Sequence, residues 1–125
     1  RPLRKFVEPV ALREAQEEIG LAPSLVEVVG TLPTYTTGTQ FIITPVVALV
    51  RPDHRLAINA FEVADAFEVP LDFLMNPRHH HRHAFEWGGV RREWFSMPYM
   101  DGPTERFIWG ATAGMLRNFY RFLAA

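Results

Sequence analysis

The chain has 125 residues, 48% of them hydrophobic, which is enough apolar material for the core of one globular domain over residues 1–125. Its formal net charge of −1 provides no field that would draw it to nucleic acid or to an anionic membrane. The absence of cysteine excludes disulfides and thiolate metal sites and suits the cytoplasm, and no apolar run reaches the roughly 18 residues of a membrane span.

The first predicted element is a helix over residues 10–19, ended by Gly20. At about 100° per residue, Glu14, Glu17 and Glu18 fall within roughly 100° of one another around its axis. The apolar side chains that would face a core lie on the opposite side: Leu12, Ala15 and Ile19. The helix therefore presents one apolar stripe and one acidic face.

The acidic face has a chemical and a structural interpretation. Like charges one turn apart repel, so the three carboxylates cost stability unless a cation neutralises them. Carboxylate oxygens are the hard ligands that Mg²⁺ and Mn²⁺ prefer, which makes this face a candidate metal site for phosphate chemistry. A solvated acidic surface is the alternative, and helical geometry alone favours it.

The next stretch of the chain predicts strands. A strand over residues 26–32 is followed by a loop over residues 33–38. Residues 40–50 are apolar and β-branched, which predicts a strand buried on both faces and interrupted at Pro45.

The segment after residue 60 is less regular. Residues 61–67 suit a short helix, although residues 62–70 also suit a strand-like crossing, and residues 70–75 suit one helical turn. The histidine-rich tract His79–His83 is expected to be a mobile surface loop, with a part in phosphate or substrate binding as the alternative. Imidazole suits Zn²⁺ or Ni²⁺ better than Mg²⁺, so this tract does not strengthen the magnesium hypothesis.

The C-terminal part predicts a hairpin and a helix. Residues 85–87 and 92–96 flank Gly88-Gly89, a typical hairpin turn. Apolar side chains with helical periodicity follow over residues 110–124. Strands alternating with helices, without an internal repeat, indicate an α/β (α+β) fold class.

The segment Arg13–Leu21 resembles the C-terminal half of the Nudix box, Arg-Glu-(apolar)-X-Glu-Glu-X-Gly-(apolar). Every fixed position matches: Arg13, Glu14, Ala15, Glu17, Glu18, Gly20 and Leu21. Nudix hydrolases cut nucleoside diphosphates that are linked to another group. With this resemblance, a metal site becomes the favoured interpretation of the acidic face.

The other half of the Nudix box does not match. Lys5 occupies the position of a family glutamate, and a family glycine would fall before Arg1. Either the chain is truncated or a segment is missing between Arg1 and Ala11. We favour the missing segment, because the first five residues resemble a basic strand end found upstream in one Nudix subfamily, and intact mass would test this.

Further segments resemble the coenzyme A pyrophosphatase branch of the Nudix family. They are residues 32–37, 41–47, 62–74 and 105–115. The resemblance implies a Nudix-type mixed β-sheet sandwiched between α-helices. It also implies hydrolysis of the pyrophosphate of coenzyme A, with Mg²⁺ or Mn²⁺, to 3′,5′-ADP and 4′-phosphopantetheine.

The resemblance also assigns roles to residues of the acidic face. Glu14, Glu17 and Glu18 are expected to bind the metal, and Glu14 and Glu17 to be catalytic, with Glu14 the candidate base. Arg13 is expected to orient the glutamates through an ion pair.

Several other side chains are candidates for substrate binding. Arg91, Arg92 and Arg106 suit the 3′-phosphate of coenzyme A, and Tyr35 suits stacking on adenine. Each also has a structural alternative, as a solvated charge, an ion pair or a core aromatic residue. The tryptophans are expected to pack rather than to recognise a ligand: Trp87, Trp94 and Trp109.

The expected partner is a small coenzyme A-like nucleotide, with no nucleic acid and no membrane, and a homodimer is left open. Two alternatives stand beside the coenzyme A pyrophosphatase. One is hydrolysis of another nucleoside diphosphate derivative, such as ADP-ribose or a dinucleotide. The other is a Nudix-fold module that binds a nucleotide without cleaving it, which Lys5 at the glutamate position favours.

Overall fold

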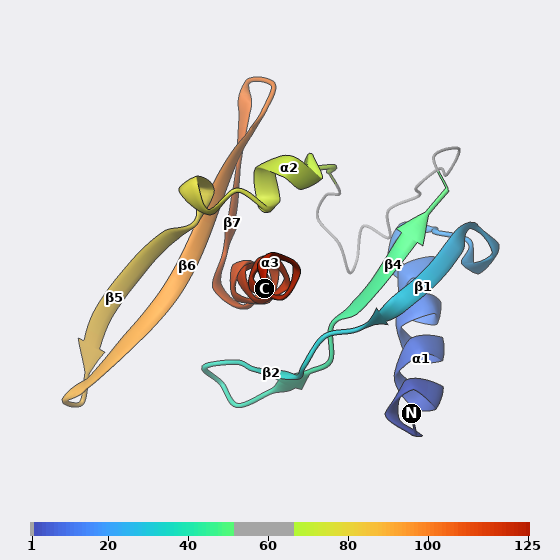
Figure 1. Ribbon diagram of the computed structural model, residues 1–125, viewed down its shortest axis with the longest axis horizontal. Helices are drawn as coiled ribbons and strands as arrows, with labels where there is room; N and C mark the ends of the chain where they lie inside the picture. Colours follow the sequence, from blue (N-terminus) through green and yellow to red (C-terminus); the bar gives the residue numbers. More distant parts are fainter. Residues whose placement is uncertain (1, 52–66) are drawn as a thin grey trace. The chain divides into compact units, whose positions relative to one another are not determined.

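The computed structural model describes the backbone over residues 2–51 and 67–125 and the side chains over residues 9–51 and 67–125 (Figure 1). The chain divides into two compact units, Arg1–Phe67 and Glu68–Ala125. The expected single domain depends on how these units assemble, so it stays a prediction. The short helix expected over residues 61–67, or the strand-like crossing over residues 62–70, lies outside the described residues as far as residue 66. The described remainder, residues 67–70, forms neither a helix nor a strand.

The first unit combines one long helix with two antiparallel strand pairs. Its elements are α1 (Pro2–Ile19), the 3₁₀ turn η1 (Pro23–Leu25), β1 (Val26–Thr31), β2 (Tyr35–Thr36), β3 (Ile42–Ile43) and β4 (Val46–Val50). β1 pairs with β4 and β2 pairs with β3. α1 lies along the β1–β4 pair and contacts both strands (Figure 1).

Helix α1 ends as predicted but begins earlier than predicted. It starts at Pro2 rather than at Val10 and includes Pro9, which removes one backbone donor without ending the helix. Gly20 adopts a left-handed φ of +71° directly after the helix. Its N–H donates to the carbonyl of Gln16 at 3.0 Å, which satisfies one of the last free carbonyls of the helix.

The strands of this unit correct two predictions. β1 forms as expected, and the stretch 40–50 is interrupted at Pro45 as expected. The predicted loop over residues 33–38 was wrong at Tyr35, which pairs with Ile43 across β2 and β3. Burial of β4 on both faces was also wrong: Leu49 is 63% exposed, because β4 belongs to a two-stranded ribbon rather than to the centre of a sheet.

The second unit is a three-stranded meander with a helix packed on it. Its elements are α2 (Leu71–Leu74), the 3₁₀ turn η2 (Pro77–His79), β5 (His81–Trp87), β6 (Val90–Asp101), β7 (Thr104–Trp109) and α3 (Gly110–Ala124). The antiparallel strand order is β5-β6-β7. The predicted helical turn, hairpin and closing helix are confirmed. Gly88 and Gly89 have φ of +58° and +77°, the conformation that a two-residue hairpin turn requires.

A small core joins α3 to the sheet of the second unit. Met97 on β6 and Ala113 on α3 are fully buried, and Ile108 on β7 is 9% exposed. Half-buried side chains surround these three: Val69, Leu74, Phe95, Tyr99 and Leu116. Because β6 supplies core residues at alternate positions, one face of the sheet is turned to α3 and the other away from it.

Both units contain helices and antiparallel strands, so the predicted α+β class is confirmed and is consistent with a Nudix fold. Each strand pairing in the described part of the chain is antiparallel. No helix among the described residues is long and apolar enough to cross a membrane.

Candidate metal site

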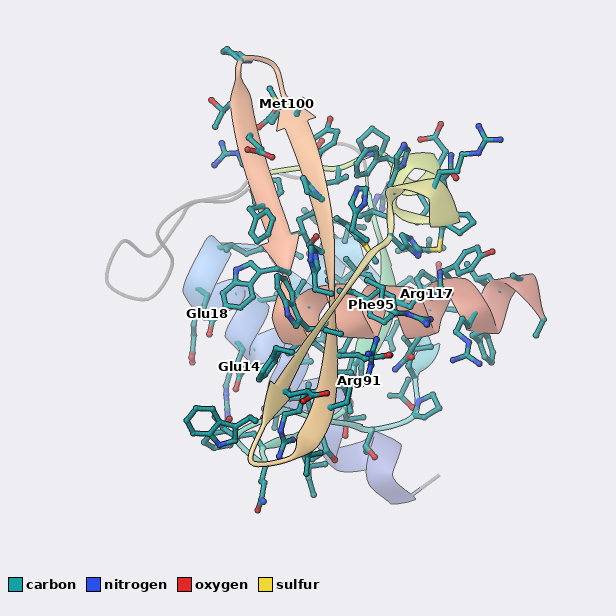
Figure 2. The ribbon with its side chains drawn as sticks, turned by 90° about the vertical axis from the view of Figure 1, so that its left-hand side faces the viewer. Glu14, Glu18, Arg91, Phe95, Met100 and Arg117 are labelled. Carbon is teal, nitrogen blue, oxygen red and sulfur yellow. The ribbon has the colours of Figure 1, made fainter. Side chains whose placement is uncertain are left out.

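The glutamates of α1 lie where helical periodicity predicts them. Glu14 and Glu18 project from the same side of α1 (Figure 2). Glu14 and Glu17 are exposed, and Glu18 is half-buried. The apolar residues of the opposite side are half-buried: Leu12, Ala15 and Ile19. α1 therefore turns its apolar stripe inward and offers carboxylates to solvent, since its contacts run to β1 and β4.

The donor chemistry of this face fits a hard divalent cation. Mg²⁺ is commonly held by one or two protein carboxylates and completes its shell with water and substrate phosphate. Glu14 and Glu18, one helical turn apart, supply such a pair. Within the described residues no group of three or more His, Asp or Glu side chains is arranged to hold a metal ion. The face can thus supply part of a coordination shell, and the metal and catalytic roles of Glu14, Glu17 and Glu18 stay predictions.

The ion pair expected for Arg13 is not formed. Its side chain is exposed, and among the described side chains no ion pair joins it to a glutamate of α1. An exposed arginine gains little from a fixed geometry in water, because solvent screens its charge.

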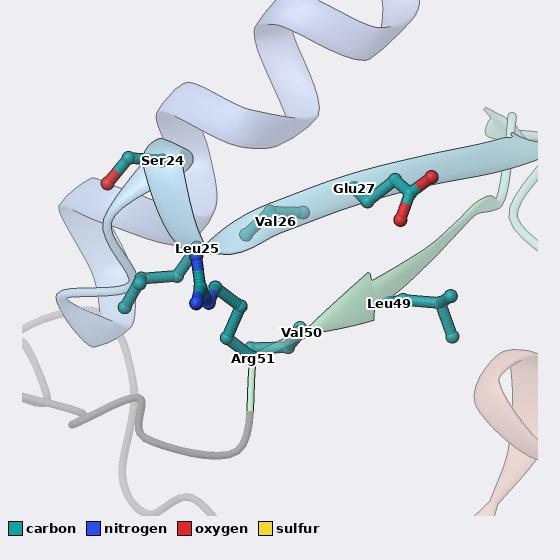
Figure 3. Close-up of a pocket in the computed structure, with 7 residues that line it drawn as sticks. All are labelled: Ser24, Leu25, Val26, Glu27, Leu49, Val50 and Arg51. Atoms are coloured by element: carbon teal, nitrogen blue, oxygen red, sulfur yellow. The ribbon is translucent and has the colours of Figure 1, made fainter.

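A shallow cavity in the first unit does not coincide with the acidic face. It has a volume of about 400 Å³ and lies where β1 and β4 meet η1 (Figure 3). Its lining residues are Ser24, Leu25, Val26, Glu27, Leu49, Val50 and Arg51. None of them is a glutamate of α1, so the cavity and the candidate metal ligands are separate features of this unit.

Two of the arginines considered for the substrate have carboxylate partners. Arg91 lies 3.5 Å from Glu93, and Arg106 lies 3.4 Å from Asp101. These contacts match their structural alternative, an ion pair. Arg92 is exposed on β6, and Tyr35 is half-buried in β2, so a role for either in substrate binding stays a prediction.

The histidine tract is not a surface loop. His79 in η2 stacks on Phe73 with ring centroids 4.0 Å apart and donates from Nδ1 to the Phe73 carbonyl at 2.9 Å. His83 in β5 stacks on Trp94 at 3.9 Å. Its Nε2 lies 2.7 Å from Oγ of the buried Ser96. The prediction of a loop was wrong because the tract contains the end of a 3₁₀ turn and the start of a strand, where neighbouring groups contact His79, His80 and His83, while His81 is exposed.

The predicted packing role holds for two of the three tryptophans. Trp94 is half-buried between His83 and Trp109, whose ring centroid lies 6.0 Å away. Trp109 is 60% exposed but also contacts Phe107, with ring centroids 6.4 Å apart, whereas Trp87 is 74% exposed, so the packing prediction was wrong for Trp87. Trp87 lies at the tip of the β5–β6 hairpin, where few neighbours can cover it.

Arg117 on α3 is a site residue that the sequence did not single out. It is half-buried, and its Nη1 donates to Nδ1 of His80 at 3.1 Å. Its guanidinium carbon lies 5.4 Å from the Phe95 ring centroid and 5.3 Å from that of Tyr120, distances typical of cation–π contacts. One signal was available: Arg117 follows Ala113 by four residues and so shares the helix face that carries a core residue.

The contact with Arg117 fixes the protonation of His80. A guanidinium can only donate, so Nδ1 of His80 must be the acceptor and Nε2 carries the proton. Nε2 donates to the Leu74 carbonyl at 2.6 Å. Burial lowers the pKa of His80 below 6.5; the carbonyl of Leu74 opposes this shift, and the charge of Arg117 adds to it.

Comparison with curated proteins gives relatives that share one name. The chain is 40% identical over 109 residues to the "Uncharacterized Nudix hydrolase NudL" of Citrobacter koseri. The matched region covers 86% of this chain and 54% of the relative. Proteins of the same name from Escherichia coli O7:K1 and Klebsiella pneumoniae are 38% and 41% identical with the same coverage. No family model matches the chain.

The chain spans about half the length of these curated relatives. The matched region includes most of the described residues, and the relatives' names agree with the resemblance of Arg13–Leu21 to the Nudix box. These relatives support the Nudix hydrolase family as the family of this chain.

Proposed function

We propose that this protein is a divalent-metal-dependent Nudix hydrolase that cleaves the pyrophosphate of coenzyme A or its derivatives to 3′,5′-ADP and 4′-phosphopantetheine. The observation that most directly supports this proposal is the acidic face of α1. There, Glu14 and Glu18 project from the same side in the residue order of the Nudix box. The relatives' names support the hydrolase class and give neither substrate nor metal. The choice of coenzyme A is supported by the segments that resemble its pyrophosphatases.

In the proposed reaction the three glutamates would share the binding of the metal, and Glu14 would have a second task. A divalent cation, when bound, neutralises phosphate charge and lowers the pKa of water. Glu18 and Glu14 would hold it from one side of α1, and Glu17 would add a third carboxylate. Glu14 is the candidate base, which would accept a proton from the attacking water as the bond between phosphorus and the bridging oxygen breaks. Glu14 is suited to this task because its carboxylate is exposed.

The direct test is a substrate panel. The purified protein is incubated with coenzyme A, ADP-ribose and diadenosine polyphosphates, each with Mg²⁺ or Mn²⁺, and the products are separated by chromatography. We expect preferred cleavage of coenzyme A and no cleavage after chelation of the metal. Preferred cleavage of ADP-ribose would reject coenzyme A but keep the reaction class. No turnover of any compound would favour the nucleotide-binding module.

A further inference from the structure

Arg117 is a half-buried cation without an anionic partner in the described part of the chain. No described carboxylate lies within ion-pair distance of it. Its described hydrogen-bond partner is the neutral imidazole of His80, and its other contacts are the faces of Phe95 and Tyr120. Burying a charge is costly unless an opposite charge compensates it. The site therefore has an excess of positive charge and several unused N–H donors.

A second arginine approaches the same aromatic ring. Arg82 on β5 is the cross-strand partner of Phe95 on β6, and its guanidinium carbon lies 5.5 Å from the ring centroid. Its nearest described carboxylate is that of Glu93, at 3.9 Å. Two guanidiniums thus contact one phenyl ring, and the one described carboxylate within ion-pair distance of either is that of Glu93, 3.9 Å from Arg82. Because like charges repel, an additional anion would stabilise this arrangement.

The contacts around Arg117 hold its guanidinium in place. Figure 2 shows Arg117 extending from α3 beside Phe95. His80, its acceptor, is itself anchored by the Leu74 carbonyl and lies edge-on to Tyr120 at 5.2 Å. A side chain already fixed in one conformation loses little entropy when it binds a ligand. The planar fork of a guanidinium suits the oxygens of a phosphate.

We propose that Arg117, assisted by Arg82, binds a phosphate monoester of a nucleotide ligand on the second unit of this chain. The proposal rests on the proposed function for the choice of a nucleotide. Arg117 would then bind substrate or product, in addition to the three candidate arginines considered from the sequence. Two of those candidates, Arg91 and Arg106, each lie within ion-pair distance of a carboxylate. Arg117 differs from them because an uncharged ring nitrogen leaves its charge uncompensated.

The test compares adenosine 3′,5′-bisphosphate with adenosine by isothermal titration calorimetry, without metal and at low salt. We expect the bisphosphate to bind at least about tenfold more tightly than adenosine. Arg117→Gln should weaken bisphosphate binding by at least about tenfold and leave adenosine binding unchanged. Arg121→Gln is the matched control: it removes the same charge from an exposed position of α3 and should change affinity by less than about twofold.

Equal losses in Arg117→Gln and Arg121→Gln would overturn the proposal, because they would reflect only the general charge of the helix. Wild-type protein that binds the bisphosphate no better than adenosine would also overturn it. Thermal melting identifies any loss of folding in Arg117→Gln. If Arg117→Gln does not fold, the proposal is tested with Arg82→Gln, whose side chain is 58% exposed. A decrease of at least about threefold in affinity for the bisphosphate supports the site, and an unchanged affinity overturns it.

The turnover of coenzyme A is measured separately in the same variants. Normal turnover of coenzyme A without the expected bisphosphate binding would reject only the Arg117 site. Bisphosphate binding at Arg117 without turnover of any nucleotide would reject the proposed hydrolase activity and retain the phosphate site.

Discussion

The main helices of the two units hold their charged side chains in opposite ways. On α1, Glu14 and Glu17 point into solvent, and the backbone rather than the side chains fixes their spacing. On α3, Arg117 is half-buried and is held by His80, by Phe95 on β6 and by Tyr120 on α3 itself. An exposed acidic face can be recognised from residue order alone, whereas a buried cation acquires its character from its neighbours.

The same contrast applies to stability. The second unit has a continuous core, with Met97 and Ala113 fully buried, while Leu21 is the only residue among those described in the first unit that reaches the buried class. Charged residues on α1 can therefore be changed without opening a core, and residues between β6 and α3 cannot. The predictions that follow separate these two kinds of residue.

The largest expected effect is on turnover. Glu18→Gln is nearly isosteric but removes a charged metal ligand, so we expect metal-dependent hydrolysis of coenzyme A to fall by at least about 10²-fold. The melting temperature should stay close to that of the wild type. Glu27→Gln, an exposed carboxylate on β1, is the control and should keep normal turnover. A normal rate in Glu18→Gln would refute the metal assignment.

The largest effect on stability is expected in the core of the second unit. Met97→Ala should lower the free energy of unfolding by about 2–5 kcal/mol, because it leaves a cavity where the side chain is fully buried. Met100→Ala, on the same strand at a side chain 59% exposed, should cost less than about 0.5 kcal/mol. Urea denaturation measures both. Similar losses in the two variants would show that β6 does not pack against α3 as described.

A smaller effect is expected where β7 turns into α3. Gly110 has a φ of +63°, and a Cβ there would meet no atom within 4 Å, so only backbone strain opposes a side chain. Gly110→Ala should destabilise the protein by about 1 kcal/mol. Gly30→Ala on β1 has equal space and no positive φ, and it should be neutral or slightly stabilising. Equal effects in thermal melting would exclude strain as the cause.

The smallest effect is a pH dependence from His80. Burial lowers its pKa below 6.5 in the folded chain, with smaller effects in the same direction from Arg117, His79 and His81. The unfolded chain therefore takes up this proton first as the pH falls. The contribution of His80 is complete above pH 6.5 and is lost as the pH falls through the folded pKa.

This dependence is measured by urea denaturation between neutral and mildly acidic pH. His80→Gln cannot take up the proton and should flatten the curve in this range. His81→Gln, at the neighbouring exposed position, is the control and should retain the slope. An unchanged slope in His80→Gln would show that a group other than His80 causes the pH dependence.

Much of the local structure could be predicted from the sequence because it depends on neighbours along the chain. Gly20 ends α1, Gly88 and Gly89 form the hairpin turn, and periodic apolar residues build α3. The start of α1 was missed, because Pro9 is compatible with a helix only when the surrounding turns hold it. The pairing of Tyr35 with Ile43 was missed because two-residue strands leave no detectable alternation.

The acidic face of α1 could be predicted from residue order: helical periodicity places Glu14 and Glu18 on one side, and their order within Arg13–Leu21 identifies the Nudix resemblance. The surroundings of Arg117 become visible only in the folded chain. Its contact with His80 joins residues 37 positions apart, and no local pattern encodes such a pair. The reason is physical: exposed ligands need only a regular backbone, whereas the charge state and orientation of a half-buried side chain depend on groups that folding brings to it.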